Sequence, residues 1–172
     1  MPPHYRPIVI TATMAAIALL TLSGCTSKSG ESQFIRKTPS DYNATETLRR
    51  FTHALAPKRY RPIHRLDHTV LATGEKMYLK PTLSIDLSNP LIDSKLLDCN
   101  PTMAVDLPIR IGVYRSLDGH VTLVYTQPEY WSLKHNIKDK NCLQLVKIMA
   151  RDLDEAAAAV AQSDKEKSVT KR

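Results

Sequence analysis

The stretch IRIGVYRSLDGHVTLVYT, residues 109–126, decides the fold because it contains two strands and the turn between them. Apolar residues occupy every second position on both sides of the turn: Ile109, Ile111, Val113, Val121, Leu123 and Tyr125. This alternation predicts strands over Ile109–Arg115 and His120–Thr126, each with one buried face. Asp118-Gly119 is a favoured two-residue turn. The stretch therefore predicts an antiparallel hairpin.

Three further strands are predicted outside this hairpin. Gln33–Lys37 favours a short edge strand, and Thr82–Leu87 alternates cleanly between apolar and polar residues. Arg59–Leu66 also has the pattern of a strand. Pro62 lies within it and indicates an edge position or a bulge, because proline has no N–H to donate to a central ladder.

Two helices have recognisable start signals. Asn43 is a suitable N-cap, and Glu46 three residues later completes a capping box. Pro57 ends this first helix. Asn89-Pro90 supplies a second N-cap followed by proline at the first helical position, which predicts a short helix through about Leu97.

The C-terminal part of the chain is predicted to be helical. Pro128–His135 favours a short helix or turn, and Cys142–Ala161 predicts a long helix with apolar residues along one face. The strands and helices do not follow an alternating βαβ order. They therefore predict an α+β fold, in which helices pack on one face of an antiparallel sheet.

Composition limits the class of protein. The chain has 172 residues, of which 42% are hydrophobic and 24% charged, which excludes a disordered or collagenous chain. Its three cysteines are too few for a disulfide-dense scaffold. The sequence contains neither a Gly-x-Ser-x-Gly motif nor a Gly-rich phosphate loop. We therefore expect one globular domain with appendages and no recognisable catalytic motif.

The N-terminus has the pattern of an export signal. Met1–Pro7 is short and positive, and Ile8–Leu22 is uncharged but shorter than the ~20 residues that span a bilayer. Leu22-Ser23-Gly24-Cys25 resembles the bacterial lipoprotein box. The resemblance implies that Cys25 is lipidated and that residues 1–24 are a cleaved signal peptide. The alternatives are an ordinary signal peptide or a short membrane anchor with a chance cysteine.

The other segments follow from this assignment. We expect a flexible tether over 25–32, a single domain over 33–162 and a charged, disordered tail over 163–172. The membrane is then a partner through the N-terminal lipid. Thr26 stands where an Asp often signals retention in the inner membrane, so we expect the outer membrane, facing the periplasm. In a host with one membrane, the chain sits on the outer face of the cytoplasmic membrane.

Several short motifs occur in an order typical of one family: Leu79-Lys80-Pro81-Thr82, Asn89-Pro90, Asp106-Leu107-Pro108, Asp118-Gly119, Tyr125, Pro128, Tyr130 and His135. Over about Ser40–Ala161 the chain resembles the family catalogued as domain of unknown function 302. His68 also falls where the family usually has a histidine. The resemblance implies a TATA-binding-protein-like α+β architecture with a long C-terminal helix, and it implies no reaction. The chain departs from the family at Leu87-Ser88 and Thr126-Gln127.

Positive charge is concentrated in one segment of a chain whose net charge is +7. Residues 49–65 contain six basic residues and no acid. We expect Arg59, Arg61 and Arg65 to share one side of their strand. Arginines on an edge strand can simply prevent edge-to-edge pairing. The functional interpretation is contact with anionic headgroups. Export argues against nucleic acid as a partner.

Histidines suggest a metal or a catalytic base, but their spacing gives little support. His64 and His68 would lie ~13 Å apart on one strand, too far for a shared ion. We therefore predict no metal and no cofactor. His68 and His135 are expected to be hydrogen-bonded structural residues, and a periplasmic enzyme that uses one of them is the alternative.

Cys99 and Cys142 remain as a pair once Cys25 is lipidated. Thiols commonly pair in an oxidising compartment, and both residues lie at the ends of predicted helices. The bridge would close a loop of about 43 residues. The alternative is two separately buried thiols.

These patterns favour a lipid-anchored cell-envelope protein with a non-catalytic binding or assembly role. A sheet covered by helices on one face leaves the other face for an envelope protein or a small apolar ligand. A convergent polar cluster in a closed pocket would instead favour the enzyme.

Overall fold

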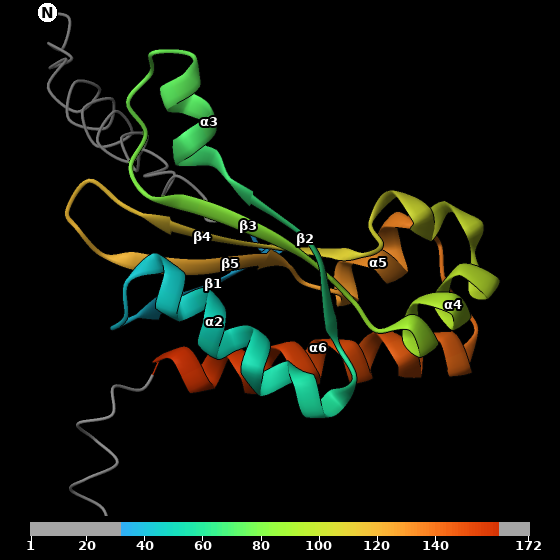
Figure 1. Ribbon diagram of the computed structural model, residues 1–172. Coiled ribbons are helices and arrows are strands. Elements are labelled where there is room, and N and C mark those ends of the chain that lie inside the picture. The colour runs from blue at the N-terminus through green and yellow to red at the C-terminus, as the bar shows by residue number, and fades with distance from the viewer. Residues whose placement is uncertain (1–31, 162–172) are drawn as a thin grey trace, which may run out of the picture. The chain divides into compact units, whose positions relative to one another are not determined.

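The computed structural model describes residues 32–161 and contains a five-stranded antiparallel sheet (Figure 1). The strands lie in the order β1-β5-β4-β3-β2, so β1 and β2 form the two edges. Their bounds are β1 Ile35–Ser40, β2 Arg61–Asp67, β3 Thr82–Ser88, β4 Ile109–Arg115 and β5 Val121–Thr126. The edge positions predicted for the first two strands are confirmed.

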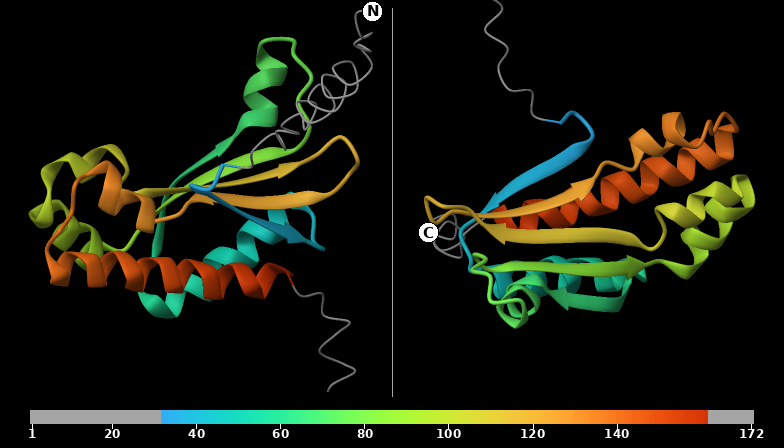
Figure 2. Two further views of the ribbon diagram at one scale, coloured as in Figure 1. Left: turned by 180° about the vertical axis from the view of Figure 1, so that it is seen from behind. Right: turned by 90° about the horizontal axis from the view of Figure 1, so that it is seen from above.

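The helices form one layer and two end groups. α2 (Ala44–Leu55) and α6 (Lys140–Ala161) lie side by side under one face of the sheet (Figures 1 and 2). α4 (Pro90–Cys99) and α5 (Glu129–Lys134) gather at one end of the sheet, whereas α3 (His68–Gly74) projects from the other end. The predicted α+β class, with a long C-terminal helix, is confirmed.

The core lies between the sheet and the layer formed by α2 and α6. The three central strands contribute apolar residues that are all buried: Leu83, Ile85, Leu87, Ile109, Ile111, Val113, Val121, Leu123 and Tyr125. Phe51 of α2 and Leu153 of α6 are fully buried against them. Ile111 pairs with Tyr125 across the hairpin, so the predicted phase of its two strands is confirmed.

The hairpin turn differs from the prediction. Ser116 N–H donates to the His120 carbonyl at 2.8 Å, and Gly119 N–H donates to the Ser116 carbonyl at 3.1 Å. The loop therefore has three residues, 117–119, instead of the two-residue turn at Asp118-Gly119. Gly119 has a φ of 94°, which closes a type I turn with a glycine bulge. Asp-Gly suits both loop types, so the dipeptide alone did not distinguish them.

The bulge predicted from Pro62 lies between Pro62 and His64. It changes the phase of β2, so that Arg61 pairs with Ser88 while Arg65 pairs with Ile85. Directly paired residues share a face, so Arg61 and Arg65 lie on opposite faces of the sheet. The expectation that they share one side with Arg59 was therefore wrong, because it assumed an unbroken alternation.

The start of α2 follows the predicted cap in part. Asn43 Oδ1 accepts a hydrogen bond from Glu46 N–H at 2.9 Å. The Glu46 carboxylate, however, accepts hydrogen bonds from Arg49 and Arg50, each at 2.7 Å through Nε. These bonds lower the pKa of Glu46 to about 2. The reciprocal half of the capping box is replaced by ion pairs one turn further along the helix.

Other boundaries differ by a few residues. α6 begins at Lys140, two residues before the predicted start, because Asp139 Oδ1 accepts from the N–H groups of Asn141 and Cys142. Three elements were not predicted, namely α3 and the 3-10 helices η1 (Ala56–Lys58) and η2 (Pro101–Val105). The signal peptide, Cys25, the tether up to residue 31 and the tail lie outside the described residues. Within 32–161, no helix is long and apolar enough to cross a membrane.

Candidate functional site

A hydroxyl, an imidazole and a carboxylate form a chain of hydrogen bonds at the α4–α5 end of the sheet. His135 Nε2 lies 2.5 Å from Asp106 Oδ2, and His135 Nδ1 lies 2.7 Å from Thr102 Oγ1. The His135 side chain is only 4% exposed. Of the histidines singled out in the sequence, His135 is therefore the one placed in a polar cluster.

Neighbouring groups complete this cluster. Lys134 Nζ donates to Asp106 at 2.9 Å, and Asn100 Nδ2 donates to the His135 carbonyl at 2.7 Å. Thr102 Oγ1 donates to Asn100 Oδ1 at 2.9 Å. Burial opposes ionisation of Asp106, but the hydrogen bonds from Lys134 and His135 prevail and lower the pKa of its carboxyl.

Two elements that are distant in sequence bring these groups together. η2 and the residue that follows it supply Thr102 and Asp106, while the end of α5 supplies Lys134 and His135. α5 ends in a tight turn in which Asn136 adopts a φ of 50° and Ile137 N–H donates to the Ser132 carbonyl at 2.9 Å. Asparagine tolerates this left-handed conformation, so the turn holds His135 in place.

A cavity of about 340 Å³ adjoins this cluster. Its walls include Asp106, Arg110, Asp86 and Trp131, and it contains the cis Leu107-Pro108 bond. Trp131 is buried, and its Nε1 has no hydrogen-bond partner among the described residues. Arg110 is bonded to Asp86 through two nitrogens, at 2.7 and 2.9 Å. The charged groups of the cavity therefore already have partners.

The second histidine considered from the sequence makes a simpler contact. His68 Nε2 lies 2.9 Å from Ser84 Oγ, at the start of α3. His64 lies 3.8 Å from Asp86. Over residues 32–161, no three His, Cys, Asp or Glu side chains gather as metal ligands would. The hydrogen bond of His68 is therefore typical of a structural residue, and among the described residues no carboxylate orients its ring.

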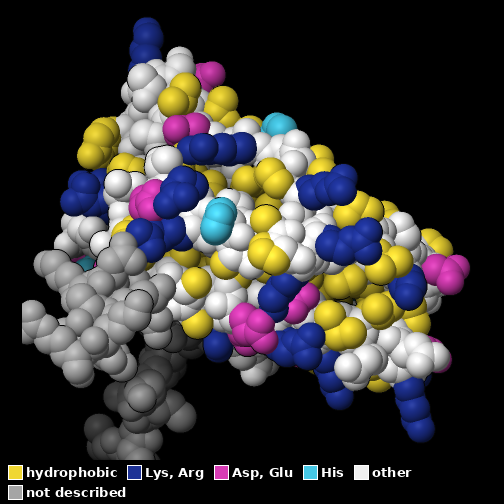
Figure 3. Space-filling view, turned by 60° about the horizontal axis from the view of Figure 1, so that its bottom comes forward, with side chains coloured by type: hydrophobic (Ala, Val, Ile, Leu, Met, Phe, Trp, Pro, Cys, Tyr) yellow, Lys and Arg dark blue, Asp and Glu magenta, His cyan; other side chains and the backbone are white. Residues whose placement is uncertain are grey.

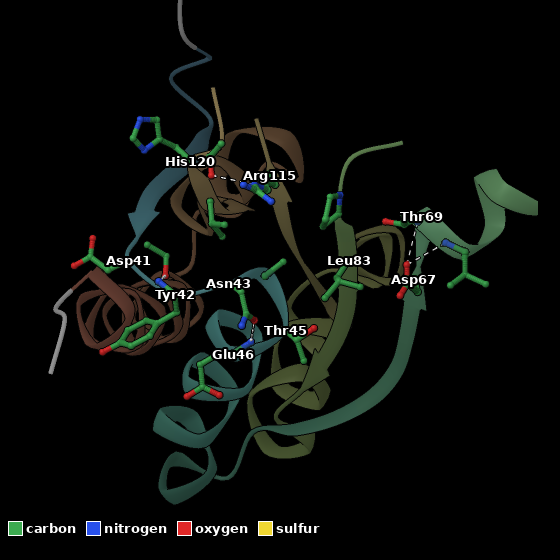
Figure 4. Close-up of a pocket in the computed structure, with 16 residues that line it drawn as sticks. Asp41, Tyr42, Asn43, Thr45, Glu46, Asp67, Thr69, Leu83, Arg115 and His120 are labelled. Atoms are coloured by element: carbon green, nitrogen blue, oxygen red, sulfur yellow. Dashed lines mark hydrogen bonds between the residues drawn. The ribbon is translucent and has the colours of Figure 1, made fainter. Parts of the chain in front are cut away.

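A larger cavity, of about 950 Å³, lies beside the N-terminus of α2 (Figure 4). Three of its polar wall residues have local structural roles. Asn43 caps α2, and Asp67 Oδ1 accepts from Thr69 and Val70 N–H to cap α3. Arg115 Nε donates to the Gly119 carbonyl at 3.2 Å. These bonds account for Asn43, Asp67 and Arg115 without a ligand.

The basic segment is partly neutralised in the fold. Lys58 Nζ is paired with Asp152 at 2.8 Å and also contacts Glu155, although both acids lie almost a hundred residues away in sequence. Arg59, Arg61 and Arg65 are exposed and form no ion pair within 32–161. On the face shown in Figure 3, basic side chains are distributed among acidic and hydrophobic ones.

Cys99 and Cys142 are joined by a disulfide with an S–S distance of 2.08 Å and a Cα–Cα distance of 6.1 Å. Cys99 is the last residue of α4, and Cys142 lies in the first turn of α6. The disulfide therefore links α4, at one end of the sheet, to α6 of the helical layer. It lies on the same side of the molecule as the His135 cluster, because both involve the connection after α4.

The His135 cluster was only partly visible in the sequence. His135 and Asp106 were both singled out, but as separate motifs. Thr102 was not identified, because η2 was not predicted. The available signal was Asn100-Pro101, which resembles the Asn89-Pro90 helix start and indicates a second capped turn.

We expect Asp106→Asn to lower the free energy of unfolding by about 1–3 kcal/mol at pH 7, because His135 and Lys134 lose a charged acceptor. The lowered pKa of Asp106 means that its contribution is present above the pKa of about 3.9 in the unfolded chain. It should disappear as the pH falls through the lower pKa of the folded state. Urea unfolding at several pH values measures this. The exposed Asp98→Asn is the control, and an equal effect of both variants would contradict the assignment.

Comparisons with known proteins agree on the family and the fold. A family model described as a domain of unknown function, DUF302, matches residues 36–160. The crystal structure of an uncharacterized conserved DUF302 protein from Bacillus stearothermophilus matches with a TM-score of 0.67 at 15% identity. The match covers 75% of this chain and 99% of that one, and at this identity it shows the fold alone. No curated protein matches the chain.

Proposed function

This chain belongs to the DUF302 family, a domain of unknown function, and we propose that it is a lipid-anchored protein of the bacterial cell envelope. Its proposed role is binding or assembly without catalysis. The observation that carries the proposal is Leu22-Ser23-Gly24-Cys25 directly after an uncharged export segment. Thr26 supports placement in the outer membrane facing the periplasm, and a host with one membrane would carry the protein on that membrane's outer face.

The disulfide supports export. Disulfides persist in oxidising compartments such as the periplasm and are rare in the cytosol. Cys99 and Cys142 use the two cysteines that lipidation of Cys25 leaves over. All three cysteines of the chain then have a chemical role that fits one compartment.

The sheet offers a surface for the proposed binding role. α2 and α6 cover one face only, and the opposite face presents the Asp86–Arg110 ion pair next to small and aliphatic side chains. Gly112 and Val124 pair on that face, where a Cβ at residue 112 would come within 2.9 Å of Val124 Cγ2. This mixed surface suits an envelope protein or a small apolar ligand.

Three arginines are candidates for contact with anionic headgroups. Arg61 and Arg65 are exposed on the edge strand β2, on opposite faces of the sheet, and the exposed Arg59 precedes that strand. Each basic residue near such a surface contributes about 1 kcal/mol. This contact would weaken at high salt, because screening reduces interactions between exposed charges.

The anchor is tested by changing its cysteine. We expect the wild-type chain to remain in the membrane fraction after washing with high salt and alkaline carbonate, and to separate with the outer membrane by density. Cys25→Ser should stop processing, so that the precursor with its signal peptide accumulates. Ser23→Ala, which keeps a small residue before the cysteine, is the control and should mature normally. Normal maturation and retention of Cys25→Ser would contradict the proposal.

One observation favours a second candidate function, a periplasmic enzyme that uses His135. Thr102 Oγ1, the His135 ring and Asp106 are ordered as nucleophile, base and orienting carboxylate are in hydrolases. Against it, Thr102 Oγ1 also donates to Asn100, and Lys134 binds Asp106. A fluorophosphonate probe distinguishes the two: labelling of Thr102 that is lost in His135→Gln supports the enzyme, and an unlabelled chain supports the binding protein. His68 has no such arrangement.

A further inference from the structure

Five large apolar side chains are exposed together on α3 and on the connection to β3. Their exposed fractions are Val70 65%, Leu71 55%, Met77 67%, Tyr78 83% and Leu79 39%. We call these five residues the α3 patch. No residue of α3 is buried, and the helix projects away from the sheet (Figures 1 and 2). An apolar cluster of this kind on a small domain marks an interaction site.

The exposure of the α3 patch is built into the local structure. Asp67 caps the start of α3. At its end, Met77 N–H donates to the Ala72 carbonyl at 2.8 Å and Lys76 N–H donates to Thr73 at 3.0 Å. Lys76 has a φ of 57°, so this is a Schellman motif with lysine at the left-handed position. The backbone thus holds the apolar side chains outward in a defined turn.

Lysines lie on both sides of the exposed turn of the α3 patch, and the nearby acids are Asp67, which caps α3, and Glu75, which precedes Lys76. Lys76 and Lys80 flank Met77, Tyr78 and Leu79, and Lys80 Nζ lies 5.6 Å from the centre of the Tyr78 ring. Apolar and aromatic side chains beside lysines are typical of segments at the bilayer interface. There the rings lie at headgroup depth and the ammonium groups reach anionic lipid.

The chain preceding the described residues is long enough for this contact. Six residues separate Cys25 from Ser32, and the seven Cα–Cα steps between them span at most about 24 Å. β1 follows at one edge of the sheet, whereas α3 follows β2 at the other edge. Four strand spacings separate these edges by about 19 Å. The strand register also places Ile35 three residues, or about 10 Å, further along the strands than Asp67, which precedes α3. The offset from Ile35 to the start of α3 is therefore about 21 Å, which an extended tether can cover.

We propose that the α3 patch inserts into the interface of the bilayer that holds the lipid anchor. It forms a second attachment that fixes the orientation of the domain and presents the rest of its surface to the periplasm. This inference rests on the proposed anchor for its cellular setting. The contact itself is made by residues 70–79 alone.

The test uses residues 26–172, which lack the lipidation site. The described core lies entirely within 32–161, and the Bacillus stearothermophilus protein has the same fold over 99% of its own chain, so this part folds without the signal peptide. We expect it to co-sediment with phosphatidylcholine–phosphatidylglycerol vesicles. Met77→Ser with Tyr78→Ser should lower the partition coefficient roughly tenfold or more. The matched control, Leu117→Ser with Leu133→Ser, changes residues 90% and 75% exposed elsewhere and should bind as the wild type does.

Depth is measured with Tyr78→Trp. The only native tryptophan, Trp131, is buried, so quenching by lipids brominated in their acyl chains reports the new side chain. Quenching supports insertion. Equal vesicle binding by the Met77/Tyr78 variant, or no binding by the wild type, overturns the inference. If the wild type instead forms a dimer, does not bind vesicles, and the Met77/Tyr78 variant is monomeric, the inference is also overturned. The patch would then be an interface with a second copy of the chain. None of these results depends on Cys25. A failed vesicle test would therefore not contradict the lipid anchor, and an unlipidated Cys25 would not contradict a positive vesicle test.

Discussion

Replacing both Cys99 and Cys142 with serine should lower the free energy of unfolding by roughly 3–4 kcal/mol. The bridge closes a loop with a sequence separation of 43, and the loss reflects the conformational freedom that the unfolded chain regains. This is a large part of the 5–15 kcal/mol that is typical of a domain. Urea unfolding of the oxidised wild type and of the double variant measures it directly.

The same experiment carries its own control. Reduction of the wild type should move its unfolding midpoint to that of the double variant, whereas the double variant should not respond to reductant. Peptide mapping without reduction should recover Cys99 and Cys142 in one linked peptide. Recovery of both as free thiols from periplasmic protein, or an unfolding curve that reductant does not change, would contradict the bridge.

Phe51→Ala should destabilise the domain by about 3–5 kcal/mol, because it removes a fully buried ring between α2 and the sheet and leaves a cavity. The ring centroid lies 6.1 Å from that of Tyr125 on β5, so the substitution loosens the contact that holds the helical layer to the sheet. Urea or thermal unfolding followed by circular dichroism provides the measurement.

The other phenylalanine of the chain provides a matched control. Phe34 is half-buried at the edge of the sheet and stacks on Tyr130 with ring centroids 4.1 Å apart. Phe34→Ala should cost only about 1 kcal/mol, since its site opens to solvent and no enclosed cavity forms. Equal losses for the two variants would mean that the core does not lie between α2 and the sheet.

Much of the fold was predictable because it depends on local patterns. The hairpin over 109–126 has a two-residue period, and Asn43 and Asn89 cap the helices that were predicted after them. α3 was missed because its residues face solvent and therefore have no apolar periodicity. The predicted phase of β2 was wrong because one bulged residue moves every following side chain to the other face of the sheet. Pro62 indicates a bulge without giving its exact place.

The polar cluster was harder to predict than the fold. Asp106 and His135 are almost thirty residues apart, and only the docking of α5 against η2 brings them within 2.5 Å. The partners of Lys58 show the same limit: Asp152 and Glu155 come from the far end of the chain. A charge count along residues 49–65 therefore overestimated the free positive charge, because it could not include acids supplied by tertiary packing.

The central claim is that the chain is held at the membrane by lipid on Cys25, and the mass of the mature N-terminus tests it most directly. Intact mass spectrometry of the native protein, extracted from membranes with detergent, should give a chain that begins at Cys25 and carries a diacylglyceryl group and an amide-linked acyl chain. Fragmentation should place all of the added mass on that first residue. A mature N-terminus at any other residue, or a chain beginning at Cys25 without acyl mass, would contradict the account.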